Sequence, residues 1–167
     1  MQVIYLGSIG SNLQPQTHVP RAVAELAELG SWLRLSAVIF TLPAAMSSAH
    51  RFANALFLLD CPLDGVALKA RFNALEGGHG RDRSDPARSV KDRTLDLDLL
   101  AAAPTLAALG EPQLPEYLQP LWPGLCRGQP LAGLELLPLR WAGLEFGHRP
   151  ATIYRDAGTG QITVVEN

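Results

Sequence analysis

The stretch Arg93-Thr94-Leu95-Asp96-Leu97-Asp98-Leu99-Leu100 alternates acidic and leucine side chains with a period of two. In a β-strand, this alternation places Asp96 and Asp98 on one face of a sheet and the leucines on the other. The two Cα atoms would lie about 6.6 Å apart, so both carboxylates could bind one Mg²⁺ ion or a pair of ions. A half-buried strand whose polar face meets only water would show the same pattern.

A strongly basic segment precedes this strand. Residues 80–93 contain four arginines and one lysine against three aspartates, and they show no apolar periodicity. Glycine, proline and serine within the segment predict a loop. Because the arginine side chain is planar and can bind two phosphate oxygens at once, Arg81, Arg83 and Arg93 beside two acids suit a metal-bound polyphosphate. A solvated loop whose charges pair with one another is the alternative.

Apolar spacing and turn residues predict the order strand, helix, strand, strand, helix, strand. One helix is expected over 19–32, and a second begins with Asp64 as its N-cap and stops at Gly77-Gly78. The four strands are expected over residues 2–6, 33–42, 52–61 and 95–101. This βαββαβ order is that of a ferredoxin-like α+β domain with an antiparallel sheet.

The length of the chain suits one domain over residues 1–167, with its core at 2–101. The remainder, 102–167, is rich in proline and glycine, and we expect an irregular C-terminal extension there. Within it, 136–141 and 161–165 are expected to form short strands.

A glycine-rich stretch, Gly7-Ser8-Ile9-Gly10-Ser11, follows the first expected strand. It lacks the Gly-Lys-Ser or Gly-Lys-Thr ending of a P-loop and the third glycine of a dinucleotide-binding fingerprint. A tight turn that shapes the floor of a pocket is therefore the prediction for this stretch.

Several motifs occur in one order along the chain, and their residues can be compared with known families. The most specific are Glu76-Gly77-Gly78-His79-Gly80-Arg81-Asp82-Arg83 and Arg93-Thr94-Leu95-Asp96-Leu97-Asp98. The weaker ones are Tyr5-Leu6-Gly7-Ser8-Ile9-Gly10-Ser11-Asn12-Leu13, Thr41-Leu42-Pro43, Phe52-Ala53-Asn54-Ala55, Leu114-Pro115-Glu116-Tyr117, Arg127-Gly128 and Gly133-Leu134-Glu135-Leu136-Leu137-Pro138. Together they resemble 6-hydroxymethyl-7,8-dihydropterin pyrophosphokinase, a folate-pathway enzyme that moves pyrophosphate from ATP to a pterin alcohol.

The resemblance implies a transferase, 2-amino-4-hydroxy-6-hydroxymethyldihydropteridine diphosphokinase, that uses ATP as co-substrate and two Mg²⁺ ions. It implies that Asp96 and Asp98 bind the metal ions and that Arg81 and Arg93 complete the catalytic set. The pterin-binding residues that it implies are Thr41, Pro43, Phe52 and Asn54. The ATP-binding residues that it implies are Glu76, Arg83, Arg93, Leu99, Tyr117 and Arg127.

Two departures from the family pattern indicate a divergent member or a paralogue. The family usually has Trp-Gly-Pro directly before the arginine at position 93, where this chain has Val90-Lys91-Asp92. Where the family has Pro-His-Tyr, this chain has Pro115-Glu116-Tyr117, which puts an acid near the expected triphosphate. A pterin- or nucleotide-binding paralogue with lost or altered catalysis is therefore the alternative function.

Composition argues for small-molecule partners. The net charge is −2 and the basic residues gather in one loop, which is unlike a general nucleic-acid binder. A ferredoxin-like nucleic-acid module would also need a Gly-Phe-Gly-Phe-type strand, which is absent from the sequence. The four histidines are scattered, so we expect surface or structural roles and no zinc; they lie at positions 18, 50, 79 and 148.

The compartment is predicted from the cysteines and from the lack of long apolar runs. Cys61 and Cys126 have no paired metal spacing and provide no disulfide framework, which fits a reducing cytoplasm. The first residues lack the basic start of a signal peptide, and no apolar run approaches the roughly 18 residues of a membrane helix. We therefore expect a cytoplasmic monomer with no nucleic-acid or membrane partner.

Overall fold

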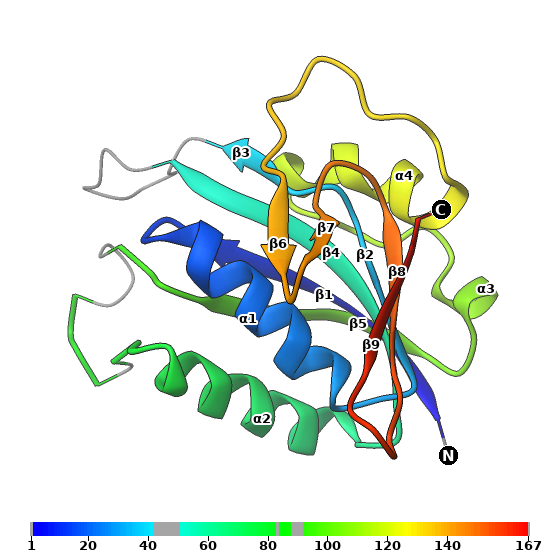
Figure 1. Cartoon of the computed structure of the whole chain (residues 1–167), viewed down its shortest axis with the longest axis horizontal. Coiled ribbons are helices and arrows are strands. Elements are labelled where there is room, and N and C mark those ends of the chain that lie inside the picture. Colours follow the sequence, from blue (N-terminus) through cyan, green and yellow to red (C-terminus); the bar gives the residue numbers. More distant parts are fainter. Residues whose placement is uncertain (1, 42–50, 83, 88–91, 167) are drawn as a thin grey trace.

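A computed structural model describes residues 2–41, 51–82, 84–87 and 92–166 (Figure 1). The elements of the first part of the chain are β1 (Val3–Ser11), α1 (Pro15–Ala27), β2 (Trp32–Leu35), β3 (Ile39–Thr41), β4 (Phe52–Cys61), α2 (Gly65–Gly78) and β5 (Asp96–Ala103). The elements of the second part are α3 (Leu106–Leu109), the 3₁₀ helix η1 (Glu116–Leu121), α4 (Trp122–Arg127), β6 (Leu139–Trp141), β7 (Leu144–Phe146), β8 (Ala151–Arg155) and β9 (Ile162–Glu166). Within the described residues, no helix is long and apolar enough to cross a membrane.

One antiparallel sheet organises the molecule. Its strands lie in the order β5-β1-β4-β2-β8-β9, and β3 pairs with β4 beside β2. The first four of these strands, together with α1 and α2, form the βαββαβ arrangement, so the predicted ferredoxin-like α+β core is confirmed. The strands β8 and β9 extend the sheet on the far side of β2.

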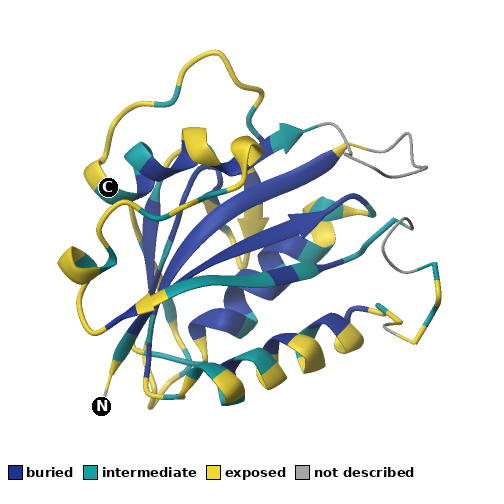
Figure 2. Ribbon diagram, turned by 180° about the vertical axis from the view of Figure 1, so that it is seen from behind, coloured by how far each residue is buried: buried dark blue, intermediate teal, exposed yellow. Residues whose placement is uncertain are grey.

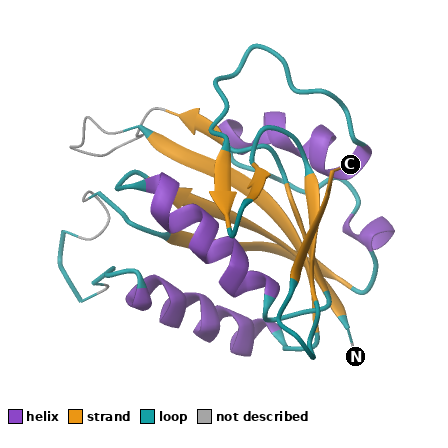
Figure 3. Ribbon diagram, viewed as in Figure 1, coloured by secondary structure: helices purple, strands orange, loops and turns teal. Residues whose placement is uncertain are grey.

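Both faces of the sheet are covered. The helices α1 and α2 pack on one face, where Tyr5, Ile9 and Phe57 join a cluster of buried apolar residues (Figure 3). The short helices η1 and α4 cover part of the other face, where Leu118 and Trp122 pack against the sheet. The central strands β1 and β4 are therefore buried along most of their length, whereas much of the edge strand β5 is half-buried (Figure 2).

The glycine-rich stretch 7–11 is strand, so the predicted turn is wrong. β1 continues to Ser11; over this stretch it pairs with β4 up to Ser11 and with β5 up to Gly10. A Cβ atom on Gly7 would lie 2.3 Å from the Phe57 ring, so a residue with a side chain would displace this core aromatic group. Tertiary packing therefore requires glycine in a strand, where glycine by itself is unfavourable.

The first helix and the strand after it have different bounds from those predicted. α1 begins at Pro15 and ends at Ala27, because the chain turns at Gly30, where a Cβ atom would lie 1.9 Å from the Asp60 carbonyl oxygen. The expected strand 33–42 is divided into β2 and β3. At the break, the Ser36 hydroxyl accepts a hydrogen bond from the Leu56 N–H at 2.9 Å in place of a strand carbonyl.

Other predicted boundaries agree closely with the structure. Asp64 caps α2, since its side chain accepts a hydrogen bond from the Ala67 N–H at 2.8 Å. The expected strands at 136–141 and 161–165 correspond to β6 and β9. The short strands β7 and β8 were missed.

Candidate active site

A row of residues crosses three neighbouring strands at Gly10. Gly10 on β1 pairs with Asn54 on β4 and with Asp96 on β5, and directly opposed residues of antiparallel strands share a face. A Cβ atom on Gly10 would lie 3.2 Å from Asn54 Oδ1, 3.7 Å from Phe52 Cδ1 and 3.8 Å from Asp96 Cβ. The missing side chain therefore lets an amide, an aromatic ring and a carboxylate converge on one point of the sheet.

Asp98 continues this polar face one step along β5, opposite Ser8. Burial raises the pKa of the Asp98 carboxyl group, and the negative charge of Asp96 raises it further. The pKa of Tyr117, on η1, is raised by burial and then by the charges of Asp98 and Asp96. The two acids therefore face the same environment, on the side of the sheet that η1 covers.

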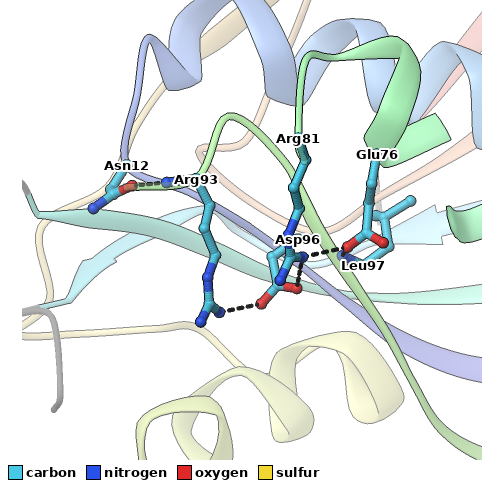
Figure 4. Close-up of polar contacts among 6 residues, drawn as sticks. All are labelled: Asn12, Glu76, Arg81, Arg93, Asp96 and Leu97. Atoms are coloured by element: carbon cyan, nitrogen blue, oxygen red, sulfur yellow. Dashed lines mark hydrogen bonds and ion pairs between the residues drawn. The ribbon is translucent and has the colours of Figure 1, made fainter. Parts of the chain in front are cut away.

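Two arginines bind Asp96 (Figure 4). Arg81 Nη1 lies 2.5 Å from Asp96 Oδ1, and Arg93 Nη1 lies 2.9 Å from Asp96 Oδ2. Both guanidinium groups belong to the basic segment and are largely buried, with side chains 11% and 20% exposed. The structure thus brings together the four residues predicted to be catalytic, since Asp98 lies two positions further along the same strand face.

Glu76, near the end of α2, binds the Arg81 guanidinium group. Its fully buried carboxylate accepts hydrogen bonds from Arg81 Nη1 at 2.6 Å and from the Leu97 N–H at 3.0 Å (Figure 4). Burial alone would lower the pKa of Arg81, but the hydrogen bonds and charges of Asp96 and Glu76 raise it above its ordinary value. Glu76 is therefore placed to position Arg81, and the ATP contact expected for it stays a prediction.

Asn12 anchors the other arginine. Its buried side chain accepts a hydrogen bond from the Arg93 N–H at 2.6 Å, and its own N–H donates to the Arg93 carbonyl oxygen at 2.9 Å. Asn12 Nδ2 also donates to Asp92 Oδ1 at 2.8 Å. The sequence interpretation included Asn12 in the motif over residues 5–13 but gave it no role. A polar residue directly after a buried strand was a usable signal.

The expected pterin-binding residues lie beside the acids. Asn54 Nδ2 donates a hydrogen bond to the Thr41 hydroxyl at 2.6 Å, and Thr41 pairs with Phe52 across β3 and β4. Asn54 and Phe52 are both buried. Pro43, the fourth expected residue, lies outside the described residues, as do Arg83 and Val90.

The remaining expected ATP-binding residues are distributed over three surroundings. Tyr117 lies within electrostatic range of the two acids, whose charges help to raise its pKa. The Leu99 side chain packs against the cluster under α1 and α2, on the opposite face of the sheet. Arg127 pairs with Glu111 at 2.7 Å on the surface, and no contact between Arg127 and the acids occurs in the described part of the chain.

The basic segment also borders a cavity of about 190 Å³ between the end of β1 and the start of β5. Its lining combines Arg81 and Arg93 with Thr94 and three aspartates. The arginines therefore lie between this cavity and the carboxylate of Asp96.

The donor set fits Mg²⁺. Among the described residues, no group of three or more histidine, cysteine, aspartate or glutamate side chains could hold a metal ion. Mg²⁺, however, is often bound by one or two carboxylates together with substrate phosphates. Asp96 and Asp98 supply two carboxylates on one face of β5, so they suit an ion that arrives with a nucleotide.

Comparison with known proteins shows the family of the chain. A family model for 7,8-dihydro-6-hydroxymethylpterin-pyrophosphokinase matches residues 6–123, from β1 to the beginning of α4. A search of curated proteins finds no match. The matched segment covers more than half of the chain and includes the acids, the arginines and Asn54. The chain belongs to the 7,8-dihydro-6-hydroxymethylpterin-pyrophosphokinase family.

Proposed function

We propose that this protein transfers pyrophosphate from MgATP to the hydroxymethyl group of 6-hydroxymethyl-7,8-dihydropterin and releases AMP. The observation that carries the proposal is the row Asn54–Gly10–Asp96, in which an amide that could recognise a pterin lies beside a carboxylate that could bind a metal ion together with Asp98. The family match supports pterin pyrophosphokinase activity in folate biosynthesis in general. A cytoplasmic monomer with two bound Mg²⁺ ions is part of the same proposal.

Asp96 and Asp98 would hold the metal. When bound, Mg²⁺ would supply Lewis-acid chemistry, which stabilises negative charge on phosphate oxygens and lowers the pKa of a hydroxyl group. The acids contribute position and negative charge, and because phosphoryl-type transfer depends mostly on positioning and charge stabilisation, no strong protein base is required.

The arginines would change partners as substrate binds. Each oxygen of Asp96 accepts a hydrogen bond, one from Arg81 and one from Arg93, so a cation on Asp96 would compete with both guanidinium groups for the same carboxylate. Phosphate oxygens offer the guanidinium groups an equally charged and geometrically suitable partner. On the transferred group, Arg81 and Arg93 would then neutralise the charge that develops during transfer.

Asn54 would recognise the edge of the pterin ring. Its Nδ2 is engaged by Thr41, whereas its Oδ1 lies near the space above Gly10 and can accept a hydrogen bond from a ring N–H group. Phe52 borders the same space and offers an apolar surface to a flat heterocycle.

On the nucleotide side, we propose Tyr117, Arg83 and Arg127 as side-chain contacts. Leu99 lies on the edge strand β5, and because its side chain is on the other face it would contact ATP through its main chain.

Replacing Asn54 by Leu should weaken pterin binding at least about tenfold, because a site built to hydrogen-bond a polar group loses that bond and exposes the ring to an apolar side chain. MgATP affinity should change little. Isothermal titration with each ligand separates the two effects, with Asn73→Leu on the exposed side of α2 as the matched control. An unchanged pterin affinity would remove Asn54 from the proposed site.

A pterin- or nucleotide-binding paralogue with altered catalysis is the second candidate, and Glu116 favours it. Glu116 is exposed on η1, directly before Tyr117, whose pKa is raised in part by the charges of Asp96 and Asp98. Its carboxylate would therefore add negative charge beside the expected triphosphate.

Replacing Glu116 by His should tighten MgATP binding in the proposed enzyme, because a like charge is removed and a cation-capable ring is added. The gain should be larger at low salt, where the repulsion is less screened. Titration of MgATP at two ionic strengths measures it. Weaker MgATP binding in the variant would favour a site retuned for another ligand.

The assay that tests the proposed function measures AMP in a mixture of wild-type protein, ATP, Mg²⁺ and 6-hydroxymethyl-7,8-dihydropterin. AMP should form only when the pterin is present. Binding of both ligands without AMP formation would support the paralogue, and formation of ADP would show a different transfer reaction.

A further inference from the structure

His79 is a buried histidine with partners on another helix. It directly follows α2, and its side chain is fully buried. Its Nε2–H donates a hydrogen bond to Glu25 Oε1 on α1 at 2.7 Å, and its Nδ1 lies 2.8 Å from Nδ1 of His18 on the same helix. Arg21 of α1 pairs with Glu25 at 3.2 Å and donates to the Gly78 carbonyl oxygen at 3.2 Å. The sequence interpretation regarded the histidines as scattered, but the fold brings two of them into contact.

These contacts form a defined chain of hydrogen bonds. Since His79 donates from Nε2 to Glu25, the two Nδ1 atoms must share one proton, and the pair can carry at most one positive charge in this geometry. The pKa of His18 is lowered by burial, by His79 and by Arg21, which is consistent with a contact that holds at neutral pH. The end of α2 is thus tied to the middle of α1.

Only Gly80 separates His79, at the end of α2, from Arg81. Gly80 adopts a positive φ of 91° and its N–H donates to the Gly77 carbonyl oxygen at 3.0 Å. The Arg81 N–H then donates to the Glu76 carbonyl oxygen at 3.0 Å. The two residues that follow His79 are therefore each held to the last turn of α2 by a backbone hydrogen bond, and Arg81 leaves the helix in a defined direction.

We propose that His79 is a positioning residue for the transfer reaction: its bonds to Glu25 and His18 hold the end of α2 so that Arg81 reaches Asp96. This inference rests on the proposed function for its catalytic consequence. The structural part, which is the placement of Arg81 by His79, rests only on the contacts of these two residues described above.

Limited proteolysis tests the structural part without any assay of activity. Trypsin must take the Arg81 side chain into its own pocket, so cleavage after Arg81 requires release of this side chain from Asp96 and Glu76. In His79→Ala, cleavage after Arg81, identified by mass spectrometry, should be several times faster than in the wild type. Cleavage after Arg34 in β2, which reports unfolding of the sheet, should not accelerate.

Two further variants make the result decisive. Glu25→Ala removes the anchor from the side of α1 and should give the same selective cleavage even if His79→Ala proves unstable. His148→Ala removes a histidine–glutamate pair of similar length, 3.0 Å to Glu166 on β9, and should leave cleavage after Arg81 unchanged. Unaltered cleavage after Arg81 in Glu25→Ala, or parallel acceleration at Arg34, would overturn the proposal.

A double-mutant cycle tests the catalytic consequence. His79→Ala should lower kcat by about ten- to a hundredfold with little change in the KM for the pterin, the scale expected when a catalytic group is misplaced by about an ångström. In an Arg81→Ala background, His79→Ala should lower kcat hardly further, because the side chain that His79 positions is absent. Additive losses would overturn the positioning role. If the wild-type protein forms no AMP, but His79→Ala and Glu25→Ala still show selective cleavage after Arg81, only the proposed function is contradicted.

Discussion

Replacing Asp98 by Asn should abolish pyrophosphate transfer and, at the same time, make the ligand-free protein more stable at neutral pH. If Asp98 binds the metal as proposed, the variant loses a charged ligand, which is worth several kcal/mol in the transition state and therefore about a thousandfold or more in rate. The gain in stability follows from the surroundings of the carboxylate, which is partly buried beside Asp96.

The sign of the stability effect follows from proton linkage. The pKa of Asp98 is raised in the folded protein by burial and by Asp96, so the folded state favours the neutral acid. Between the ordinary carboxyl pKa and the raised one, the folded state binds more protons than the unfolded state, and stability falls as the pH rises through this window. An asparagine removes that cost and should add roughly 0.5 to 2 kcal/mol to the free energy of unfolding above the window.

Asp96→Asn is the matched comparison on the same strand. It should lose turnover to a similar extent, but it should destabilise the protein by about 1 to 3 kcal/mol, because the Arg81 and Arg93 guanidinium groups lose a charged partner in a largely buried place. Denaturant unfolding at several pH values, alongside the AMP assay, measures both quantities. Equal stability changes in the two variants, or retained turnover at saturating Mg²⁺ in either, would contradict the assignment of these acids.

Replacing Arg93 or Arg81 by Ala should lower kcat by about a hundred- to a thousandfold while pterin affinity changes much less. In the proposed mechanism, these two positive charges meet their full partner charge only as the pyrophosphate group is transferred. Arg81→Ala should also reduce stability, since Glu76 would keep a buried carboxylate without its cationic partner. Arg93→Ala removes a bond to Asp96 Oδ2, whereas Asp96 Oδ1 keeps its bond to Arg81, so this variant should remain closer to wild-type stability.

Steady-state kinetics and pterin titration on each variant make the comparison, with Arg71→Ala on the exposed side of α2 as the matched control. A loss of pterin affinity as large as the loss of kcat would indicate ground-state contacts in place of transition-state stabilisation.

The local pattern around Asp96 was enough to predict the strand and its two faces. Leu95 and Leu97 are fully buried under the helices, whereas the acids face η1, as alternation requires. The βαββαβ core could likewise be predicted, because Asp64 and the apolar spacing mark its elements locally.

Other parts of the site depend on contacts between distant residues and carry no local signal. Gly7 and Gly10 suggest a turn by themselves, and they are strand residues because Phe57 and Asn54 occupy the space of their absent side chains. His18 and His79 are 61 positions apart, so their contact exists only in the folded chain. Glu76 was identified from a motif, but its role in holding Arg81 depends on complete burial, which the motif does not reveal.

A crystal structure of the protein with Mg²⁺, a non-hydrolysable ATP analogue and 6-hydroxymethyl-7,8-dihydropterin tests the central claim most directly. We expect the metal on Asp96 and Asp98, the pterin edge on Asn54 above Gly10, and the Arg81 and Arg93 side chains moved from Asp96 to the phosphates. A complex in which both arginines still bind Asp96, and in which the ligands lie away from the Asn54–Gly10–Asp96 row, would contradict it.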